Sequence, residues 1–112
     1  MTPGDIYLVE IPISGGHEQS GARPAIILQN PAYSNTLSTV LIVPLTSQLK
    51  ALSFPGTLRV QPNTSNRLQK ESGALVFLLR AIDRRRLKGR IGTLSTEMLA
   101  EIKNAVRDMM NL

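Results

Sequence analysis

The stretch TVLIVPLT, Thr39–Thr46, decides the fold because it is apolar at nearly every position. An apolar run of this length is typical of a strand buried on both faces of a sheet. Pro44 lies inside the run and has no backbone N–H, which predicts a bulge or an edge position at that residue. We therefore expect a buried strand over 39–46 that is irregular at Pro44.

Shorter runs of the same kind lie on both sides of this stretch. They predict further strands over Ile6–Ile11, Pro24–Gln29, Thr57–Val60 and Gly73–Ala81. The segments between them carry turn residues, and we expect loops over Pro12–Ala22 and Asn30–Ser38 and a polar surface connection over Asn63–Lys70.

The end of the chain has helical periodicity instead. Ser95 or Thr96 can accept the first free N–H groups of a helix, and Glu97 suits its first turn. The apolar face of this helix is formed by Met98, Leu99, Ile102, Ala105, Val106 and Met109. A single helical turn is expected over Asp83–Leu87, with Asp83 as its N-cap. Strands followed by a terminal helix predict one α+β, mainly β, barrel-like domain over residues 1–112.

The composition excludes several kinds of site. The chain has no cysteine and 1 histidine, so one copy can form neither a disulfide nor a zinc site of the usual His/Cys type. The 8 carboxylates are scattered, without the cluster that a magnesium site needs. We therefore expect no metal and no cofactor. The N-terminus does not resemble a signal peptide and no apolar run is long enough to span a bilayer, so we expect a cytoplasmic protein.

Basic residues outnumber acidic ones by 13 to 8, and the formal net charge is +5. A basic domain of this size attracts polyanions. One stretch, opposed only by Asp83, contains Arg80, Arg84, Arg85, Arg86, Lys88 and Arg90. The run 84–86 is a solvated face, a grip on phosphates or a docking site for an acidic protein tail. Arg80 lies inside an apolar run, where it either contacts the polyanion or forms a structural pair.

The loop His17–Pro24, with the sequence HEQSGARP, joins two predicted strands and concentrates polar groups. Loops held by rigid strands are where functional groups usually lie. Arg23 precedes Pro24, which favours an extended backbone and therefore a defined direction for the arginine side chain. Further along the chain, Thr46 and Ser47 place two hydroxyl groups at the end of the buried strand.

These segments resemble the MazF/PemK toxins. The resemblance covers nearly the whole chain and rests on Gly4–Tyr7 (GDIY), Gly16–Pro24 (GHEQSGARP), Val43–Ser47 (VPLTS) and Arg80–Leu87 (RAIDRRRL). It implies a small barrel-like antiparallel sheet of the PemK/CcdB and SH3-like type, a homodimer, and the toxin role in a type II toxin–antitoxin system. The implied activity is that of an mRNA interferase, an endoribonuclease that cuts single-stranded RNA sequence-specifically and without metal. The implied partner is a cognate antitoxin whose disordered tail wraps the toxin.

The resemblance also implies catalytic roles. RNA supplies its own nucleophile, the 2′-OH, so the protein must hold the geometry, move protons and stabilise charge on the phosphoryl group. Arg23 suits the last role because a guanidinium holds two phosphate oxygens and stays protonated. The Thr46 hydroxyl would bond the phosphate or orient the 2′-OH. His17 is the first candidate for a proton carrier and Glu18 the next. The predicted RNA-binding residues are Glu18, Gln19, Ser20, Ser47, Ser72 and Arg80.

Structural readings of the same residues stay open. His17 could be a solvated loop residue, Arg23 could pair with Glu18 across the loop, and Thr46 could bond the backbone at the strand end.

The sequence departs from its relatives before the RAID segment. PemK-branch members carry an arginine and an aspartate at the positions of Leu75 and Phe77, and MazF-branch members often carry a glutamine at that of Leu78. Either the remaining site suffices or activity is weak. One alternative is a degenerate member that binds antitoxin without cutting RNA. Another is a CcdB-like gyrase-binding toxin, against which Arg23 and Thr46 argue.

Overall fold

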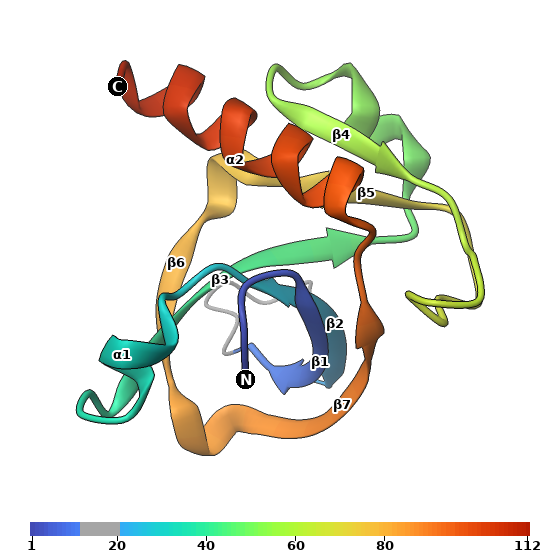
Figure 1. Ribbon diagram of the computed structural model, residues 1–112. Helices are drawn as coiled ribbons and strands as arrows, with labels where there is room; N and C mark the ends of the chain where they lie inside the picture. Colours follow the sequence, from blue (N-terminus) through green and yellow to red (C-terminus); the bar gives the residue numbers. More distant parts are fainter. Residues whose placement is uncertain (12–20) are drawn as a thin grey trace.

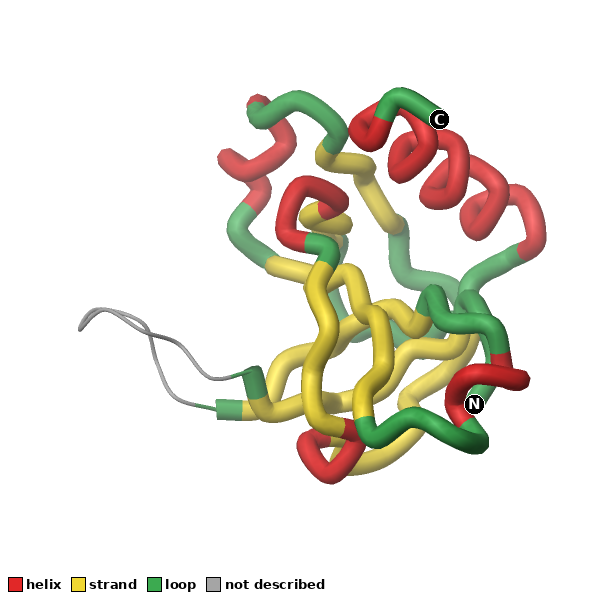
Figure 2. The backbone as a smooth tube through the Cα atoms, turned by 90° about the vertical axis from the view of Figure 1, so that its left-hand side faces the viewer, coloured by secondary structure: helices red, strands yellow, loops and turns green. Residues whose placement is uncertain are grey.

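The structure, a computed structural model, describes residues 1–11 and 21–112 and contains a seven-stranded antiparallel sheet that curls on itself (Figures 1 and 2). The strands are β1 (Asp5–Glu10), β2 (Ala22–Ile27), β3 (Thr39–Thr46), β4 (Thr57–Val60), β5 (Ser72–Leu75), β6 (Arg80–Asp83) and β7 (Leu87–Thr93). Their order is β4-β5-β3-β2-β1-β7, and β6 also pairs with β3. The predicted fold class, a mainly β sheet with a terminal helix, is confirmed.

Strand β3 has the predicted bounds and is buried on both faces from Ile42 to Leu45, whereas Leu41 is 40% exposed on one face. Val43 and Leu45 join one hydrophobic cluster, and Val40 and Ile42 join a second cluster on the other face. Successive side chains of a strand point to opposite faces, so this one strand contributes to both halves of the core.

The bulge or edge position predicted at Pro44 was wrong, because β3 keeps its register against β2 through Pro44 and has partner strands on both sides. β3 pairs with β2 on one side, and on the other side with β6 up to Ile42 and with β5 from Leu45 onward. Pro44 therefore lies in the gap between two partners. The Arg84 N–H donates to the Ser38 carbonyl at 2.9 Å. Because backbone groups alternate along a strand, the even-numbered residues of β3, Pro44 included, direct theirs toward the side of β6 and β5. A residue without an N–H is tolerated where no partner is present.

The single strand predicted over Gly73–Ala81 was wrong. The chain forms β5, leaves the sheet in the 3-10 turn η2 (Val76–Leu78), and returns as β6. This excursion lies opposite Pro44, where β3 cannot supply the N–H that would hold a continuous partner. An apolar run indicates burial but does not show where a partner strand is interrupted.

Helix α2 (Thr96–Met110) covers one side of the curled sheet (Figures 1 and 2). Ser95 is its N-cap, as one of the two predicted alternatives, and its side chain accepts the Met98 N–H at 3.1 Å. Ile102 is fully buried against the core, and the predicted apolar face reaches as far as Val106. Met109 is 44% exposed, so the predicted face packs on the sheet only as far as Val106 and its last turn is open to a partner.

Short helical turns complete the fold. α1 (Pro31–Ser34) lies in the segment predicted as a loop, and η1 (Leu49–Ser53) follows β3. The predicted turn at Asp83 is confirmed as η3 (Arg84–Arg86), with the Asp83 side chain accepting the Arg85 N–H at 2.9 Å. None of the helices in the described ranges has the length and apolarity needed to span a bilayer.

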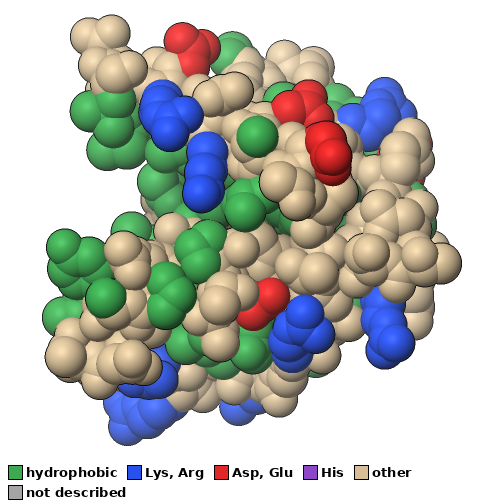
Figure 3. Space-filling model, in the orientation of Figure 1, with side chains coloured by type: hydrophobic (Ala, Val, Ile, Leu, Met, Phe, Trp, Pro, Cys, Tyr) green, Lys and Arg blue, Asp and Glu red, His purple; other side chains and the backbone are tan. Residues whose placement is uncertain are grey.

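A hollow opens below the C-terminal helix on the face shown in Figure 3, with hydrophobic side chains on its floor and basic ones at its rim. It corresponds to a cavity of about 370 Å³ lined by Leu28, Leu41, Leu79, Lys103, Val106, Arg107 and Met110.

Candidate active site

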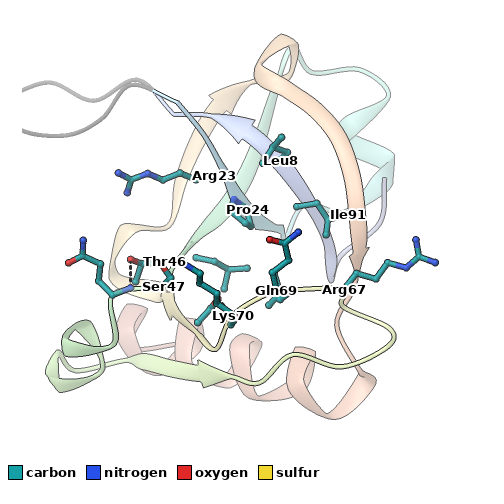
Figure 4. A pocket seen from close by; sticks show the side chains of 13 residues that line it. Leu8, Arg23, Pro24, Thr46, Ser47, Arg67, Gln69, Lys70 and Ile91 are labelled. Carbon is teal, nitrogen blue, oxygen red and sulfur yellow. Dashed lines mark hydrogen bonds between the residues drawn. The ribbon is translucent and has the colours of Figure 1, made fainter.

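A second, larger cavity of about 530 Å³ opens between β2, the end of β3 and the connection from β4 to β5 (Figure 4). Arg23 and Pro24 come from β2, and Thr46 and Ser47 from the end of β3. Leu8 and Ile91 supply apolar walls from β1 and β7. The structure thus brings the predicted Arg23 and Thr46 to one cavity, although they lie far apart in the sequence.

Arg23 is positioned by sheet pairing. It is a residue of β2 opposite Val9 of β1, and Pro24 pairs with Leu8. The extended backbone expected before Pro24 is confirmed. The arginine is half-buried, and its side chain extends outward at the same end of the cavity as Thr46 (Figure 4). Its guanidinium is therefore accessible to a ligand.

Thr46 ends β3 and shapes the turn that follows. Its Oγ1 accepts the Gln48 N–H at 3.1 Å. The structural reading of Thr46 as a residue that bonds the backbone at the strand end is therefore correct. A hydroxyl has one hydrogen and two lone pairs, so this bond leaves the hydrogen and one lone pair for a ligand. Both roles are compatible in one side chain.

Two further predicted residues line the same cavity. Ser47 is exposed beside Thr46, and Ser72 is buried at the start of β5. The Ser72 hydroxyl donates to the Lys70 carbonyl at 3.0 Å, so only its lone pairs are left for a ligand.

The connection between β4 and β5 was predicted only as a polar surface segment. Arg67, Gln69 and Lys70 line the cavity, which sequence reasoning missed. Gln69 and Lys70 point into it, whereas Arg67 points away at the end opposite Arg23 (Figure 4). The prediction of a surface position was wrong for Asn66, which is 1% exposed. No local pattern distinguished Arg67, Gln69 and Lys70 from other polar surface residues.

The lining of the cavity is positively charged. Arg23, Arg67 and Lys70 line it, and the described lining residues include no carboxylate. The remaining polar lining consists of hydroxyl and amide groups, which bond phosphate oxygens or base edges. Such a surface binds anions, and several cations along one cavity suit a ligand with several negative charges.

The other predicted site residues are not in this lining. Arg80 is an exposed residue of β6 opposite Ile42, and its RNA contact stays a prediction. His17, Glu18, Gln19 and Ser20 lie outside the described residues.

The arginine run in η3 is mostly engaged in local structure. Arg84 Nη1 donates to the Ser34 carbonyl at 2.6 Å. Arg85 bonds both oxygens of Asp83, and this hydrogen-bonded pairing lowers the pKa of the Asp83 carboxyl to about 2. These contacts favour the structural interpretation of 84 and 85 over a grip on phosphates.

The apolar residues Leu75, Phe77 and Leu78 lie together where β5 leaves the sheet. Phe77 and Leu78 are exposed on η2, and the Phe77 ring packs edge-on against Phe54 with centroids 5.6 Å apart. Leu75 pairs with Thr57 at the end of β5. None of these side chains lines the basic cavity.

A small curled antiparallel sheet with a basic cavity at the ends of its strands defines a polyanion-binding, barrel-like β protein. Residues 2–110 match the family model described as "PemK-like, MazF-like toxin of type II toxin-antitoxin system". The chain therefore belongs to this family of toxins, and the predicted membership is confirmed.

Individual relatives agree. The curated Endoribonuclease MazF of Staphylococcus saprophyticus is 30% identical over 106 residues, which cover 95% of this chain and 88% of that protein. A crystal structure of MazF from Deinococcus radiodurans has a TM-score of 0.80 at 24% identity and covers 100% of this chain and 97% of that one. A mycobacterial endoribonuclease in complex with its cognate antitoxin has a TM-score of 0.77 at 19% identity, covering 100% and 96%.

Proposed function

We propose that the protein is the toxin of a type II toxin–antitoxin pair and a metal-independent endoribonuclease of single-stranded RNA. The observation that carries the proposal is the meeting of Arg23 and Thr46 at one basic cavity, in a chain of the MazF-like toxin family. Support for the activity comes from the relative named Endoribonuclease MazF.

The reaction uses the RNA's own 2′-oxygen as the nucleophile. The 2′-oxygen attacks the adjacent phosphorus in line, the bond from phosphorus to the 5′-oxygen breaks, and the products are a 2′,3′-cyclic phosphate and a 5′-OH. The proton of the 2′-OH passes to a general base, and a general acid returns one to the departing 5′-oxygen. The protein must therefore hold the in-line geometry and stabilise the extra charge on the phosphoryl oxygens.

Arg23 stabilises that charge. Its guanidinium can donate to two phosphoryl oxygens at once, and its permanent protonation suits it to charge stabilisation rather than to proton transfer. Thr46 uses its free hydrogen to donate to a phosphate oxygen while Gln48 holds its oxygen in place. His17 is the proposed proton carrier, with Glu18 as the second candidate, because the unperturbed imidazole titrates nearest to neutral pH.

The remaining assignments concern RNA contact and assembly. Gln19, Ser20, Ser47, Ser72 and Arg80 are proposed to position the RNA. The partners are a cognate antitoxin, as in the mycobacterial endoribonuclease complex, and a second copy of the chain in a homodimer. The protein is proposed to act in the cytoplasm.

The activity is tested with purified protein and a long single-stranded RNA in excess EDTA. We expect discrete fragments whose ends carry cyclic phosphate and 5′-OH groups. Arg23→Ala should slow the formation of the fragments by about 10²- to 10³-fold, and Arg107→Ala on α2 serves as the matched control of equal charge change. RNA that stays intact, or is cut only when metal is added, would overturn the proposal.

Thr46 is tested with two substitutions. Thr46→Val removes both the donor and the acceptor that bonds Gln48, and we expect kcat/KM to fall by about a hundredfold, the size of effect seen when a transition-state donor is lost. Thr46→Ser keeps the hydroxyl and should stay within severalfold of the wild type. An unchanged kcat/KM in Thr46→Val would overturn the role of the hydroxyl, and an equal loss in Thr46→Ser would show that the hydroxyl alone is not sufficient.

A degenerate toxin remains the second candidate, favoured by the apolar Leu75, Phe77 and Leu78. It predicts antitoxin binding with no RNA cleavage and growth arrest that Arg23→Ala leaves unchanged.

A further inference from the structure

The connection between β4 and β5 is held in one conformation by the side chain of Asn66. Its Oδ1 accepts the N–H groups of Asn63 and Leu68, each at 3.0 Å, and its Nδ2 donates to the Gln61 carbonyl at 2.8 Å. The side chain is 1% exposed, so water does not compete for these bonds. One buried amide therefore ties together both ends of a turn that has no regular secondary structure.

The same turn is also fixed against the sheet. The Thr93 N–H donates to the Ser65 carbonyl at 3.0 Å. A methyl group placed on Gly92 would lie 2.5 Å from that carbonyl oxygen, so the turn packs directly on the backbone of β7. Arg67 has a φ of 55°, a left-handed conformation that non-glycine residues adopt only when their surroundings require it. These contacts with β7 hold the segment that leads to the cavity in one conformation.

This rigid segment delivers Lys70 to the wall of the cavity that contains Arg23 and Thr46 (Figure 4). Lys70 is exposed, and it forms no ion pair within residues 1–11 and 21–112. The neighbouring Glu71 is paired with Arg59 on β4 instead. A positive charge without a counter-ion among the described lining residues is available to an anionic ligand.

We propose that Lys70 binds a backbone phosphate next to the scissile one, and that Asn66 is the positioning residue for this contact. The proposal rests on the proposed function, because it names a subsite of the same RNA-binding cavity. Lys70 would be a second anchor beside Arg23 and would fix the direction in which the RNA crosses the site. A lysine ammonium is a compact point charge with three donors, which suits phosphate contact independent of base identity.

The test measures binding of a short RNA with a 2′-deoxyribose at the mapped cleavage position, which removes the nucleophile. Lys70→Gln is compared with Lys103→Gln, an equal charge change on α2 outside this cavity. We expect Kd to rise about five- to tenfold for Lys70→Gln, with Lys70→Arg restoring most of the affinity. The slope of log Kd against log salt should fall by about 0.7, the value for one phosphate contact on a single strand, and should not change for Lys103→Gln.

Neutral methylphosphonate linkages, placed one at a time, then locate the contact. One linkage near the cleavage position should weaken wild-type binding and have no effect on Lys70→Gln. If the two lysine variants behave alike, or if every linkage matters equally in both proteins, the assignment of Lys70 is overturned. If the wild type neither binds nor cuts RNA but binds an acidic antitoxin peptide through Lys70, the proposed function fails instead.

The role of Asn66 is tested by a double-mutant cycle on the same RNA. If Asn66 acts through Lys70, Asn66→Ala should raise Kd in the wild type and should raise it much less in Lys70→Gln. Should Asn66→Ala not fold, Asn66→Asp keeps the acceptor for both N–H groups, loses the donor to the Gln61 carbonyl and adds a negative charge, and it is compared with and without Lys70→Gln in the same way. Equal effects in both backgrounds would make Asn66 a purely structural residue.

Discussion

Replacing Asn66 by alanine should destabilise the protein far more than a typical substitution in a surface connection. The variant loses three hydrogen bonds, to the Asn63 and Leu68 N–H groups and the Gln61 carbonyl. Each such bond contributes about 1 kcal/mol net, and a buried group left without a partner costs about 1–3 kcal/mol. The Leu68 N–H is buried, so water cannot replace its lost acceptor. We expect the free energy of unfolding to fall by about 3–4 kcal/mol.

The assay is urea denaturation followed by circular dichroism, with a thermal melt as a second measurement. For a domain of this size a loss of 3–4 kcal/mol lowers Tm by roughly 12–16 °C. The matched control is Asn104→Ala on α2, where the amide oxygen accepts an exposed bond from Arg107 at 2.9 Å. That change should stay within about 0.5 kcal/mol, because it is exposed and alanine favours the helix.

A loss below about 1 kcal/mol for Asn66→Ala, with an unchanged m-value, would refute the reasoning. It would mean that the contacts with β7 alone keep the turn in its conformation. Asn66 would then have no positioning role for Lys70.

Three further predictions follow from other parts of the structure. Gly92→Ala should cost about 3 kcal/mol in urea denaturation because its methyl group meets backbone oxygens at 2.5 and 2.6 Å, whereas Gly89→Ala, with open space around it, should be neutral or slightly stabilising; equal effects would contradict this. Arg23→Ala should lower kcat/KM for RNA cleavage by about 10²- to 10³-fold at unchanged Tm, and a smaller loss would remove Arg23 from the chemistry. The Asp83 carboxyl should titrate with a pKa of about 2 by NMR and return toward 3.8 in Arg85→Gln. Because the folded-state pKa is the lower one, the stabilisation from this pair is complete above about pH 4 and is lost as the pH falls toward 2; a pKa near 3.8 in the wild type would contradict the pairing.

The sequence predicted strands correctly where their bounds follow from a local apolar run. It failed where the bounds depend on pairing with residues distant in sequence. The bounds of β3 follow from its apolar run, and Ser95 and Asp83 cap their helical turns because a capping side chain needs only the next residues of its own chain. The division of 73–81 into two strands depends on Pro44, which lies across the sheet and is distant in sequence. Local pattern carries no information about such an opposite residue.

The candidate site shows the same limit. Arg23 and Thr46 were predicted from motifs, and the structure places both at one cavity. Lys70 was missed because nothing local distinguishes it from the other surface lysines. Its position depends on a buried asparagine four residues earlier and on a glycine of β7 that admits the turn.

The sequence by itself determined the toxin family, the barrel-like β class, the central buried strand and the capped terminal helix. Each of these features follows from a contiguous motif, from the spacing of apolar residues or from a capping residue. Only the tertiary structure decided that Pro44 faces a gap between two partner strands, that Arg23 and Thr46 line one cavity, and that Lys70 shares this basic cavity with them. These features arise from contacts between residues remote in sequence, which form only when the sheet has closed around its core.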